Sequence, residues 1–404
     1  MAEATSIWKN SGLRAYLGAT AFSGMALAMQ QLLVSWLLIG TLQLPADQVG
    51  IIQALIGIPG IIVMLVGGAS ADRRDARSLL IKVYLFAPVL PLYLVFVEQS
   101  GLLGVTHVTL FGLGMGFVMS YSTPAQQAIL NRVSGDDVQQ VVTGATAIGF
   151  GVQVAGLILA GQMDRIGITP VLLLQSVGLG LACVMTMRIA KQSPRSQAAP
   201  SPVREIAAGL VATYRDKVIF ALLSINFVSS IFNAGSFITV YPFIIKRIYD
   251  GDAFILSLLM ATFFAGAAVS NAILLRFMPL RFPGRLFLLM QLSRIVVLVL
   301  VWIKPDWWLL VLATLGWGLN MGVTTNLART IVQESAEPAF RGRVLSVVSV
   351  GMIGSASIGA ILLGWLIETV GTVNALIPAM VVSFALFIIG ILFTRIWAYE
   401  SRVG

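Results

Sequence analysis

The chain has 404 residues, of which 58% are hydrophobic and 11% are charged, with a formal net charge of +9. A soluble globular domain usually carries about 25% charged residues. This composition therefore excludes a water-soluble fold, and lipid is the expected solvent.

Long apolar runs recur along the chain, and each is close to the roughly 20 residues that a helix needs to cross the hydrocarbon core. The runs exceed the length of a barrel strand, so they are predicted to be helices. The sequence predicts an all-α integral membrane protein with twelve transmembrane helices. In chain order they are Leu17–Gly40, Val49–Ala71, Val83–Val97, Leu102–Leu130, Val138–Met163, Gly167–Met187, Val218–Ile245, Ala253–Leu275, Leu286–Ile303, Trp307–Ala328, Val344–Ile367 and Gly371–Thr394.

The basic residues predict the orientation. An even number of spans places both termini on one side. If that side is the cytoplasm, nearly all Lys and Arg residues face inward, and the outer loops keep only Arg165, Lys246, Arg247 and Lys304. Because positive residues favour the cytoplasmic side, we expect cytoplasmic termini in a plasma membrane, such as a bacterial inner membrane. The positive charge then faces anionic lipid, and nucleic acid is not an expected partner.

Two glycine ladders indicate an internal repeat. Each has glycines at five-residue spacing in a predicted span and is followed by an acidic residue and a short outer loop. The ladders are Gly151, Gly156 and Gly161 before Asp164, and Gly354, Gly359 and Gly364 before Glu368. Glycines mainly allow close helix packing, but the shared order half a chain apart favours two parallel six-helix halves. The predicted domains are residues 1–190 and 218–404.

The segment between the halves, residues 191–217, begins with a run rich in proline and serine, which is typical of a linker. Ile206, Leu210, Val211 and Tyr214 then recur at helical spacing among charged residues. This pattern predicts an amphipathic helix on the inner membrane surface.

Several spans carry polar residues, which are costly in a membrane and serve either as hydrogen-bonded packing or as pathway lining. In the seventh span Asn226, Ser229, Ser230 and Asn233 share one helical face. The other candidates are Gln30, Gln31, Tyr121, Asn320 and Thr324.

Arg294 lies within the ninth span. Insertion of an arginine at the centre of a helix costs about 2.5–3.5 kcal/mol, and no acid occurs in the middle of any predicted span. Two interpretations stay open. Arg294 either bonds to Gln291, Ser293 and backbone carbonyls, or faces inward and holds an anionic group of a substrate.

Other functional classes find little support. No phosphate-binding loop occurs, so an ATP-driven pump is not expected. His107 is the only histidine, which leaves little material for a metal site or a Ser-His nucleophile. We expect no cofactor and no enzymatic activity. A membrane enzyme or a signalling scaffold is the alternative of another class.

The loop between spans two and three resembles the signature of the major facilitator superfamily, G-x-x-x-D-R-x-G-R-R. The matching residues are Gly68, Asp72, Arg73 and Arg77. Asp75 stands where many members have glycine, and Ala76 replaces an expected arginine. With an aspartate at position 75, this loop resembles that of the enterobactin-exporter and macrolide-efflux-like branch. The loop between spans ten and eleven, with Gln333, Arg341, Gly342 and Arg343, also resembles that branch.

The resemblance implies alternating access, with a cavity lined mainly by spans one, four, seven and ten and with Asp72 capping the start of span eleven. The expected function is a secondary-active or facilitative exporter of a small amphipathic molecule, such as a drug or a siderophore-like metabolite. An uptake carrier or uniporter is the alternative within transport. We expect a monomer with a small-molecule substrate; a coupling ion is left open.

Overall fold

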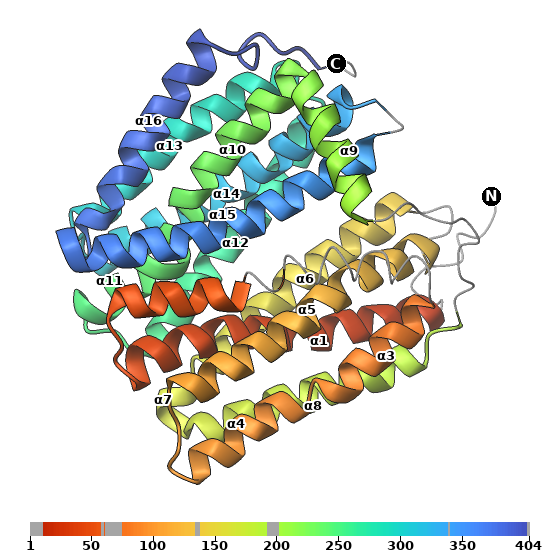
Figure 1. Cartoon of the computed structure of the whole chain (residues 1–404), viewed down its shortest axis with the longest axis vertical. Helices are drawn as coiled ribbons and strands as arrows, with labels where there is room; N and C mark the ends of the chain where they lie inside the picture. The colour runs from red at the N-terminus through yellow and green to blue at the C-terminus, as the bar shows by residue number, and fades with distance from the viewer. Residues whose placement is uncertain are drawn as a thin grey trace. The chain divides into compact units, whose positions relative to one another are not determined.

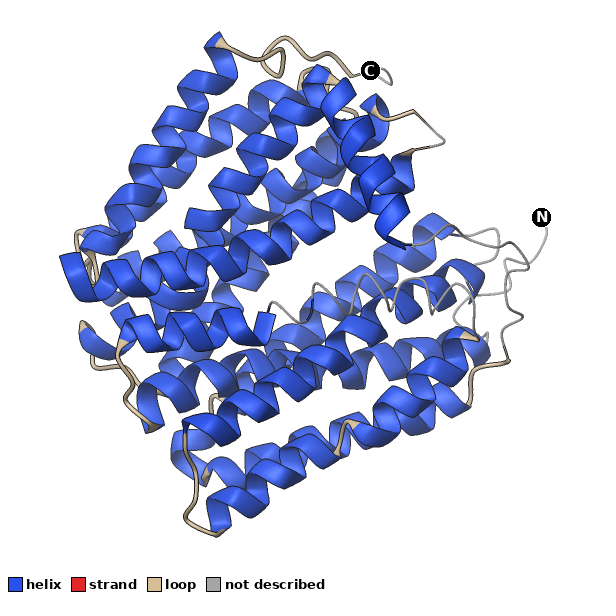
Figure 2. Cartoon of the chain, viewed as in Figure 1, coloured by secondary structure: helices blue, strands red, loops and turns tan. Residues whose placement is uncertain are grey.

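The computed structural model describes residues 11–57, 60, 75–133, 138–191, 202–337 and 340–401. Every regular element in this part of the chain is a helix (Figure 2). Ten helical stretches are long and apolar enough to cross a membrane, and large side chains on them stay exposed, such as Trp308 and Leu392. Such apolar surface suits lipid rather than water. The all-α membrane prediction is confirmed for the described residues.

Two predicted spans fall outside these ten. The second, Val49–Ala71, is described as a helix only over residues 46–57, and most of its remainder lies outside the described residues. The fourth, Leu102–Leu130, corresponds to the long helix α5 (Val105–Val133). It is not among the ten sufficiently apolar helices. The count of twelve therefore stays a prediction.

The chain forms two compact units. Unit 1 comprises Met1–Leu42, Pro59–Pro202 and Asp252–Ala261. In it α1 packs against α6 and α8, and α8 also packs against α3 and α4 (Figure 1). Its elements are α1 (Ser11–Trp36), the π-helical turn η2 (Leu37–Thr41), α3 (Ala76–Phe86), α4 (Val89–Gln99), α5, α6 (Val138–Ala160), α7 (Met163–Ile166), α8 (Ile168–Met187) and the start of α12 (Ala253–Phe277).

Unit 2 comprises Gln43–Ile58, Val203–Gly251 and Thr262–Gly404. Here α10 packs against α15, and α13 packs against α14 and α16. Its elements are the helix 46–57, α9 (Pro202–Arg215), α10 (Lys217–Gly235), η3 (Ser236–Val240), α11 (Tyr241–Arg247), the rest of α12, α13 (Pro283–Trp302), α14 (Trp307–Ser335), α15 (Arg341–Val370), η4 (Asn374–Leu376) and α16 (Ile377–Leu392).

Each unit contains a segment from the other half of the sequence. Residues 252–261 belong to unit 1, and residues 43–58 belong to unit 2. The predicted domains, by contrast, divide the chain at the linker, and that division stays a prediction. Within the linker, residues 192–201 lie outside the described residues, and α9 follows them. Leu210, Val211 and Tyr214 are exposed on α9.

The glycine ladders lie where helices approach closely. A Cβ added to Gly156 of α6 would lie 2.4 Å from the carbonyl oxygen of Met25 in α1. A Cβ added to Gly359 of α15 would lie 2.1 Å from the carbonyl oxygen of Ile231 in α10. Only glycine permits such contacts. The two ladders therefore make equivalent contacts, one in each unit.

Candidate functional site

The polar centre of unit 2 is the guanidinium of Arg294, in the middle of α13. Its side chain is 3% exposed. Nη1 donates to Ser229 Oγ in α10 and, at 2.9 Å, to Gln291 Oε1 one turn back. Nη2 donates to Asn320 Oδ1 in α14 at 3.2 Å. Three helices thus meet at one cation.

The partners of Arg294 also bond to one another. Ser229 Oγ donates to Gln291 Oε1 at 3.2 Å. Asn320 Nδ2 donates to the carbonyl oxygen of Met290 at 2.6 Å and to Ser293 Oγ at 2.7 Å. These donations direct the Asn320 oxygen toward Arg294. Thr324 is buried nearby and donates to the carbonyl oxygen of Asn320 in its own helix.

The predicted polar face of α10, which we call the α10 stripe, comprises Asn226, Ser229, Ser230 and Asn233. Its residues other than Ser229 have different surroundings. Asn233 Oδ1 accepts a bond of 2.7 Å from the buried Trp317 indole. Ser230 Oγ lies 2.8 Å from Ser355 Oγ of α15, in a hydroxyl–hydroxyl bond. Asn226 lines a cavity. The shared helical face predicted from the sequence therefore contains both packing contacts and a residue that borders open space.

That cavity has a volume of about 350 Å³. It lies among α9, α10 and α15, and its lining is mainly apolar, with Phe227 and Val347 as examples. Ser224 and Asn226 contribute its polar groups. Thr213 also borders the cavity, but its hydroxyl is buried and has no hydrogen-bond partner. Ligand cavities usually combine apolar walls with a few polar groups in this way.

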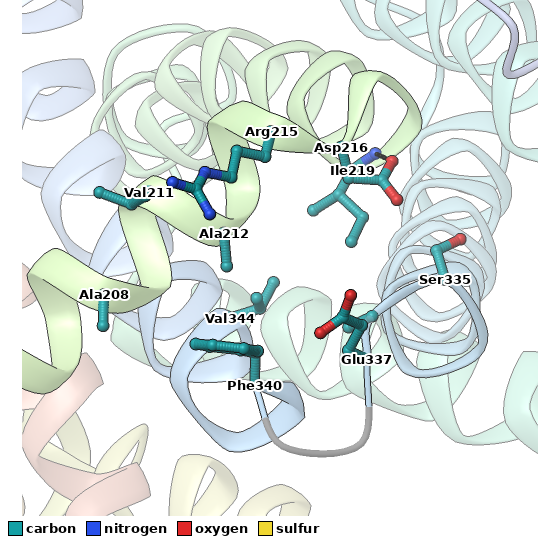
Figure 3. Close-up of a pocket in the computed structure, with 11 residues that line it drawn as sticks. Ala208, Val211, Ala212, Arg215, Asp216, Ile219, Ser335, Glu337, Phe340 and Val344 are labelled. Atoms are coloured by element: carbon teal, nitrogen blue, oxygen red, sulfur yellow. Dashed lines mark hydrogen bonds between the residues drawn. The ribbon is translucent and has the colours of Figure 1, made fainter.

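A larger cavity of about 500 Å³ lies between α9 and the loop that joins α14 to α15. Figure 3 shows Glu337 and Phe340 across from Arg215 and Asp216. Asp216 caps α10, because its carboxylate accepts from the backbone N–H groups of Val218 and Ile219. Arg215 and Glu337 are exposed. This cavity therefore borders solvated charges at helix ends.

In unit 1 the predicted residues lie on α1 and α5. Gln31 and Tyr121 are half-buried. Gln30 Oε1 accepts from Gln175 Nε2 at 3.4 Å, and the same nitrogen donates to the carbonyl oxygen of Ala26 at 2.9 Å. Gln175 could not be predicted from the sequence, because a single buried glutamine within an apolar run has no periodic pattern to mark it.

A second missed residue in unit 1 is Gln126 of α5. Its Nε2 donates to Ser23 Oγ at 2.9 Å and to the Tyr84 hydroxyl at 2.7 Å. The three side chains come from three helices. Their meeting could not be found from spacing within one segment.

Of the first loop motif, Gly68, Asp72 and Arg73 lie outside the described residues. Arg77 is described, and its Nη2 donates to the carbonyl oxygen of Met187 at 2.7 Å. Asp75 caps α3 by accepting from the Arg77 backbone N–H.

The second loop motif surrounds the start of α15. Gln333 is exposed near the end of α14. Arg341 and Gly342 begin α15, with side-chain environments outside the described set. The Arg343 guanidinium carbon lies 5.2 Å from the centre of the Phe340 ring.

Among the described residues, no three His, Cys, Asp or Glu side chains lie close enough to hold a metal ion. The polar cluster at Arg294 consists of neutral amides and hydroxyls around one arginine. Such groups can orient a bound molecule by hydrogen bonds.

Comparisons with solved structures find transporters. A point mutant of the nucleoside transporter NupG has 13% identity and a TM-score of 0.77, over 94% of this chain and 98% of that chain. An inward-facing bacterial homologue of the human lysosomal transporter Spinster has 13% identity and a TM-score of 0.71, covering 96% and 98%. A point mutant of the peptide transporter POT in complex with alafosfalin has 16% identity and a TM-score of 0.70, covering 96% of both chains. These likenesses show the fold.

No curated protein matches the chain significantly. The family model described as "transmembrane secretion effector" matches residues 6–402, which is nearly the whole sequence. With its all-helical fold, the chain therefore belongs to this family of the major facilitator superfamily of membrane transporters.

Proposed function

We propose that this protein exports a small amphipathic molecule, such as a drug or a siderophore-like metabolite, by secondary-active or facilitative alternating access. The observation that carries this substrate class is the cavity of about 350 Å³ in unit 2. Its apolar walls suit a hydrophobic body, and Ser224 and Asn226 suit a polar substituent.

The direction of transport rests on two supports. The family description refers to secretion, and the loop motifs resemble the enterobactin-exporter and macrolide-efflux-like branch. The second candidate is an uptake carrier, because the same fold is found in a nucleoside transporter and a peptide transporter. An enzyme or a scaffold is disfavoured because the family and these structures are those of transporters.

The proposal includes a setting for this activity. The protein has twelve spans in two parallel halves and is a monomer in a bacterial inner membrane, with both termini in the cytoplasm. Its polar residues in spans one, four, seven and ten take part in the transport pathway. Asp72 stabilises one state by capping span eleven, since a carboxylate is favoured at a helix N-terminus.

Transport by the purified protein tests this proposal. Proteoliposomes sorted into right-side-out and inverted orientations are incubated with a panel of amphipathic drugs and hydroxamate or catecholate chelators, with and without a pH gradient. With a pH gradient, secondary-active export predicts accumulation inside inverted vesicles only, beyond that of empty liposomes. Facilitative transport predicts equilibration that is faster than in empty liposomes, without accumulation. Accumulation in right-side-out vesicles would support the uptake carrier instead. The transporter proposal is rejected if no compound moves in either orientation.

A further inference from the structure

The guanidinium of Arg294 is a buried cation without a matching anion. Its side chain is 3% exposed in the interior of unit 2. The ion pairs found among the described residues, Arg247–Glu368 and Arg281–Glu400, lie elsewhere. The helices α10, α13 and α14 meet at Arg294. The predicted transmembrane spans that correspond to these helices contain no acidic residue. A guanidinium stays charged in proteins, so the interior of this unit holds an uncompensated positive charge.

Neighbouring residues accept some of the hydrogen bonds that the Arg294 guanidinium can donate, but none of them neutralises its charge. Ser229, Gln291 and Asn320 are neutral acceptors and occupy three of its N–H groups. A guanidinium has five. Nε is buried with no acceptor, and Nη2 makes only one bond. Neighbouring nitrogens of this planar fork are the groups that pair with a carboxylate in a bidentate way.

The acceptors are held in place by further bonds. Asn320 Nδ2 donates to Met290 and Ser293, which fixes the direction of its oxygen. Gln291 Oε1 accepts from both Ser229 and Arg294. The guanidinium is thereby fixed in one orientation before any ligand arrives, which reduces the entropic cost of binding.

The site is linked through α10 to the cavity described above. Ser229, which accepts from Arg294, follows Asn226 by one helical turn, and Asn226 lines the cavity. Residues three apart lie on the same side of a helix. The edge of the cavity at Asn226 therefore lies one helical turn from the Ser229 hydroxyl that accepts from Arg294.

We propose that Arg294 is an anion-binding residue of the transport site, and that the substrate is an amphipathic anion bearing a carboxylate. This inference rests on the proposed function and narrows it from amphipathic molecules in general to amphipathic acids. Ser229, Gln291 and Asn320 are positioning residues, which hold the guanidinium while the carboxylate takes the N–H groups that they leave.

The test measures binding of octanoate and of octanamide, which has the same chain and no charge, to the purified full-length protein. The expected result is that Arg294→Lys weakens octanoate binding by about tenfold or more, the fold-change expected when a charge-assisted hydrogen bond is lost. Octanamide binding should not change. The matched control is Arg276→Lys, an exposed arginine at the end of α12, which should bind both compounds as the wild type does.

A second variant covers the case in which Arg294→Lys fails to fold. Asn320→Asp places a carboxylate beside Nη2 and keeps the side-chain shape. It should neutralise Arg294 internally and abolish octanoate binding while octanamide still binds. If Arg294 were a packing residue alone, octanoate binding would survive in Asn320→Asp, and the proposal would be overturned.

Two further results would overturn the proposal. One is equal octanoate affinity in the wild type and Arg294→Lys. The other is a wild-type protein that binds no octanoate but unfolds at a higher temperature in chloride than in gluconate, with this difference lost in Arg294→Lys. That result would assign the site to an inorganic anion. Failure of the proposed function is distinguishable: octanoate would then bind at Arg294, but its uptake into proteoliposomes would be no faster than into empty liposomes. Conversely, if neutral amphiphiles were transported equally well by the wild type and by Arg294→Lys, the proposed export function would hold and the anion-binding role of Arg294 would be rejected.

Discussion

The carboxylate of Asp164 accepts a hydrogen bond of 2.8 Å from the backbone N–H of Ala253, 89 residues further along the chain. Ala253 is the first residue of α12, where the backbone N–H groups have no partner within the helix. The other carboxylate oxygen accepts a bond of 3.0 Å from the Trp36 indole. The side chain of Asp164, in the short helix α7 that follows α6, thus caps a helix that begins in the second half of the sequence.

Glu368 has the equivalent place in unit 2. Its Oε1 accepts a bond of 2.9 Å from the backbone N–H of Ala46, at the start of the helix 46–57. The same oxygen accepts from Arg247 Nη2 at 2.9 Å. Asp164 and Glu368 each follow a glycine ladder, so the repeat found in the sequence has a counterpart in the contacts that these acids make.

Asp164→Ala should destabilise the protein by about 1–2 kcal/mol, the usual cost of removing a helix cap. The Trp36 indole N–H also loses its acceptor, which adds to the loss. The measurement is the thermal unfolding of purified protein in detergent, followed by tryptophan fluorescence.

Asp306→Ala is the matched control for Asp164→Ala. Asp306 directly precedes α14 in the sequence, but its side chain makes no capping hydrogen bond. This variant should unfold close to the wild-type temperature. Equal losses in both variants would show that the effect comes from removing a negative charge near a helix end rather than a cap.

Two substitutions at Glu368 distinguish the stability contributed by the helix cap from that contributed by the ion pair. Glu368→Gln keeps an oxygen for the Ala46 N–H but loses the charge that faces Arg247. Both partners are 36% exposed, so the expected loss is only about 0.2–1 kcal/mol. Glu368→Ala loses both contacts and should cost about 1–2 kcal/mol.

Salt distinguishes the two effects at Glu368. At 1 M salt the Debye length falls to about 3 Å, so the difference between wild type and Glu368→Gln should shrink. The deficit of Glu368→Ala should persist. A deficit of Glu368→Gln that does not depend on salt would contradict the assignment of its loss to the ion pair.

The sequence predicted these features unequally, and the reason is physical. The apolar runs give the helices, because span length is set locally by the bilayer. Gln291 could be named as a partner of Arg294, since it lies one turn away in the same helix. Ser229 and Asn320 could be recognised as polar residues of spans seven and ten, but not as its partners, because helix packing brings them to α13.

The helix caps made by Asp164 and Glu368 show the same limit of prediction from the sequence. Asp164 and Glu368 stand out in the sequence as acids after the glycine ladders. Their partners, Ala253 and Ala46, contribute only backbone N–H groups. Any residue except proline has that group, so no side-chain pattern marks it. Only the packing of the helices reveals the contact.

The two asparagines of the α10 stripe should behave differently. Asn233 accepts from the buried Trp317 indole, so Asn233→Ala leaves that donor unpaired and should cost about 1–3 kcal/mol. Asn226 borders the cavity, so Asn226→Ala should reduce transport and leave the unfolding temperature close to that of the wild type. Both quantities are measured on the same purified samples, with transport expressed per folded molecule. A large loss of stability in Asn226→Ala, with normal transport, would make Asn226 a packing residue.

The first glycine ladder allows a test of close packing within one helix. A Cβ on Gly156 would lie 2.4 Å from the carbonyl oxygen of Met25 and 2.9 Å from the Cβ of Ala28, whereas one on Gly151 would meet nothing within 4 Å. Gly156→Ala should therefore force α1 and α6 apart and cost about 1–3 kcal/mol, as overpacking usually does. Gly151→Ala makes no clash and should be neutral or stabilising by up to about 1 kcal/mol, because alanine favours a helix more than glycine does. Unfolding temperatures of the two variants, measured in the same detergent, give the comparison. Because the substitutions are identical and lie in one helix, a difference between them reports the contact with α1, and equal unfolding temperatures would show that this contact is not needed for stability.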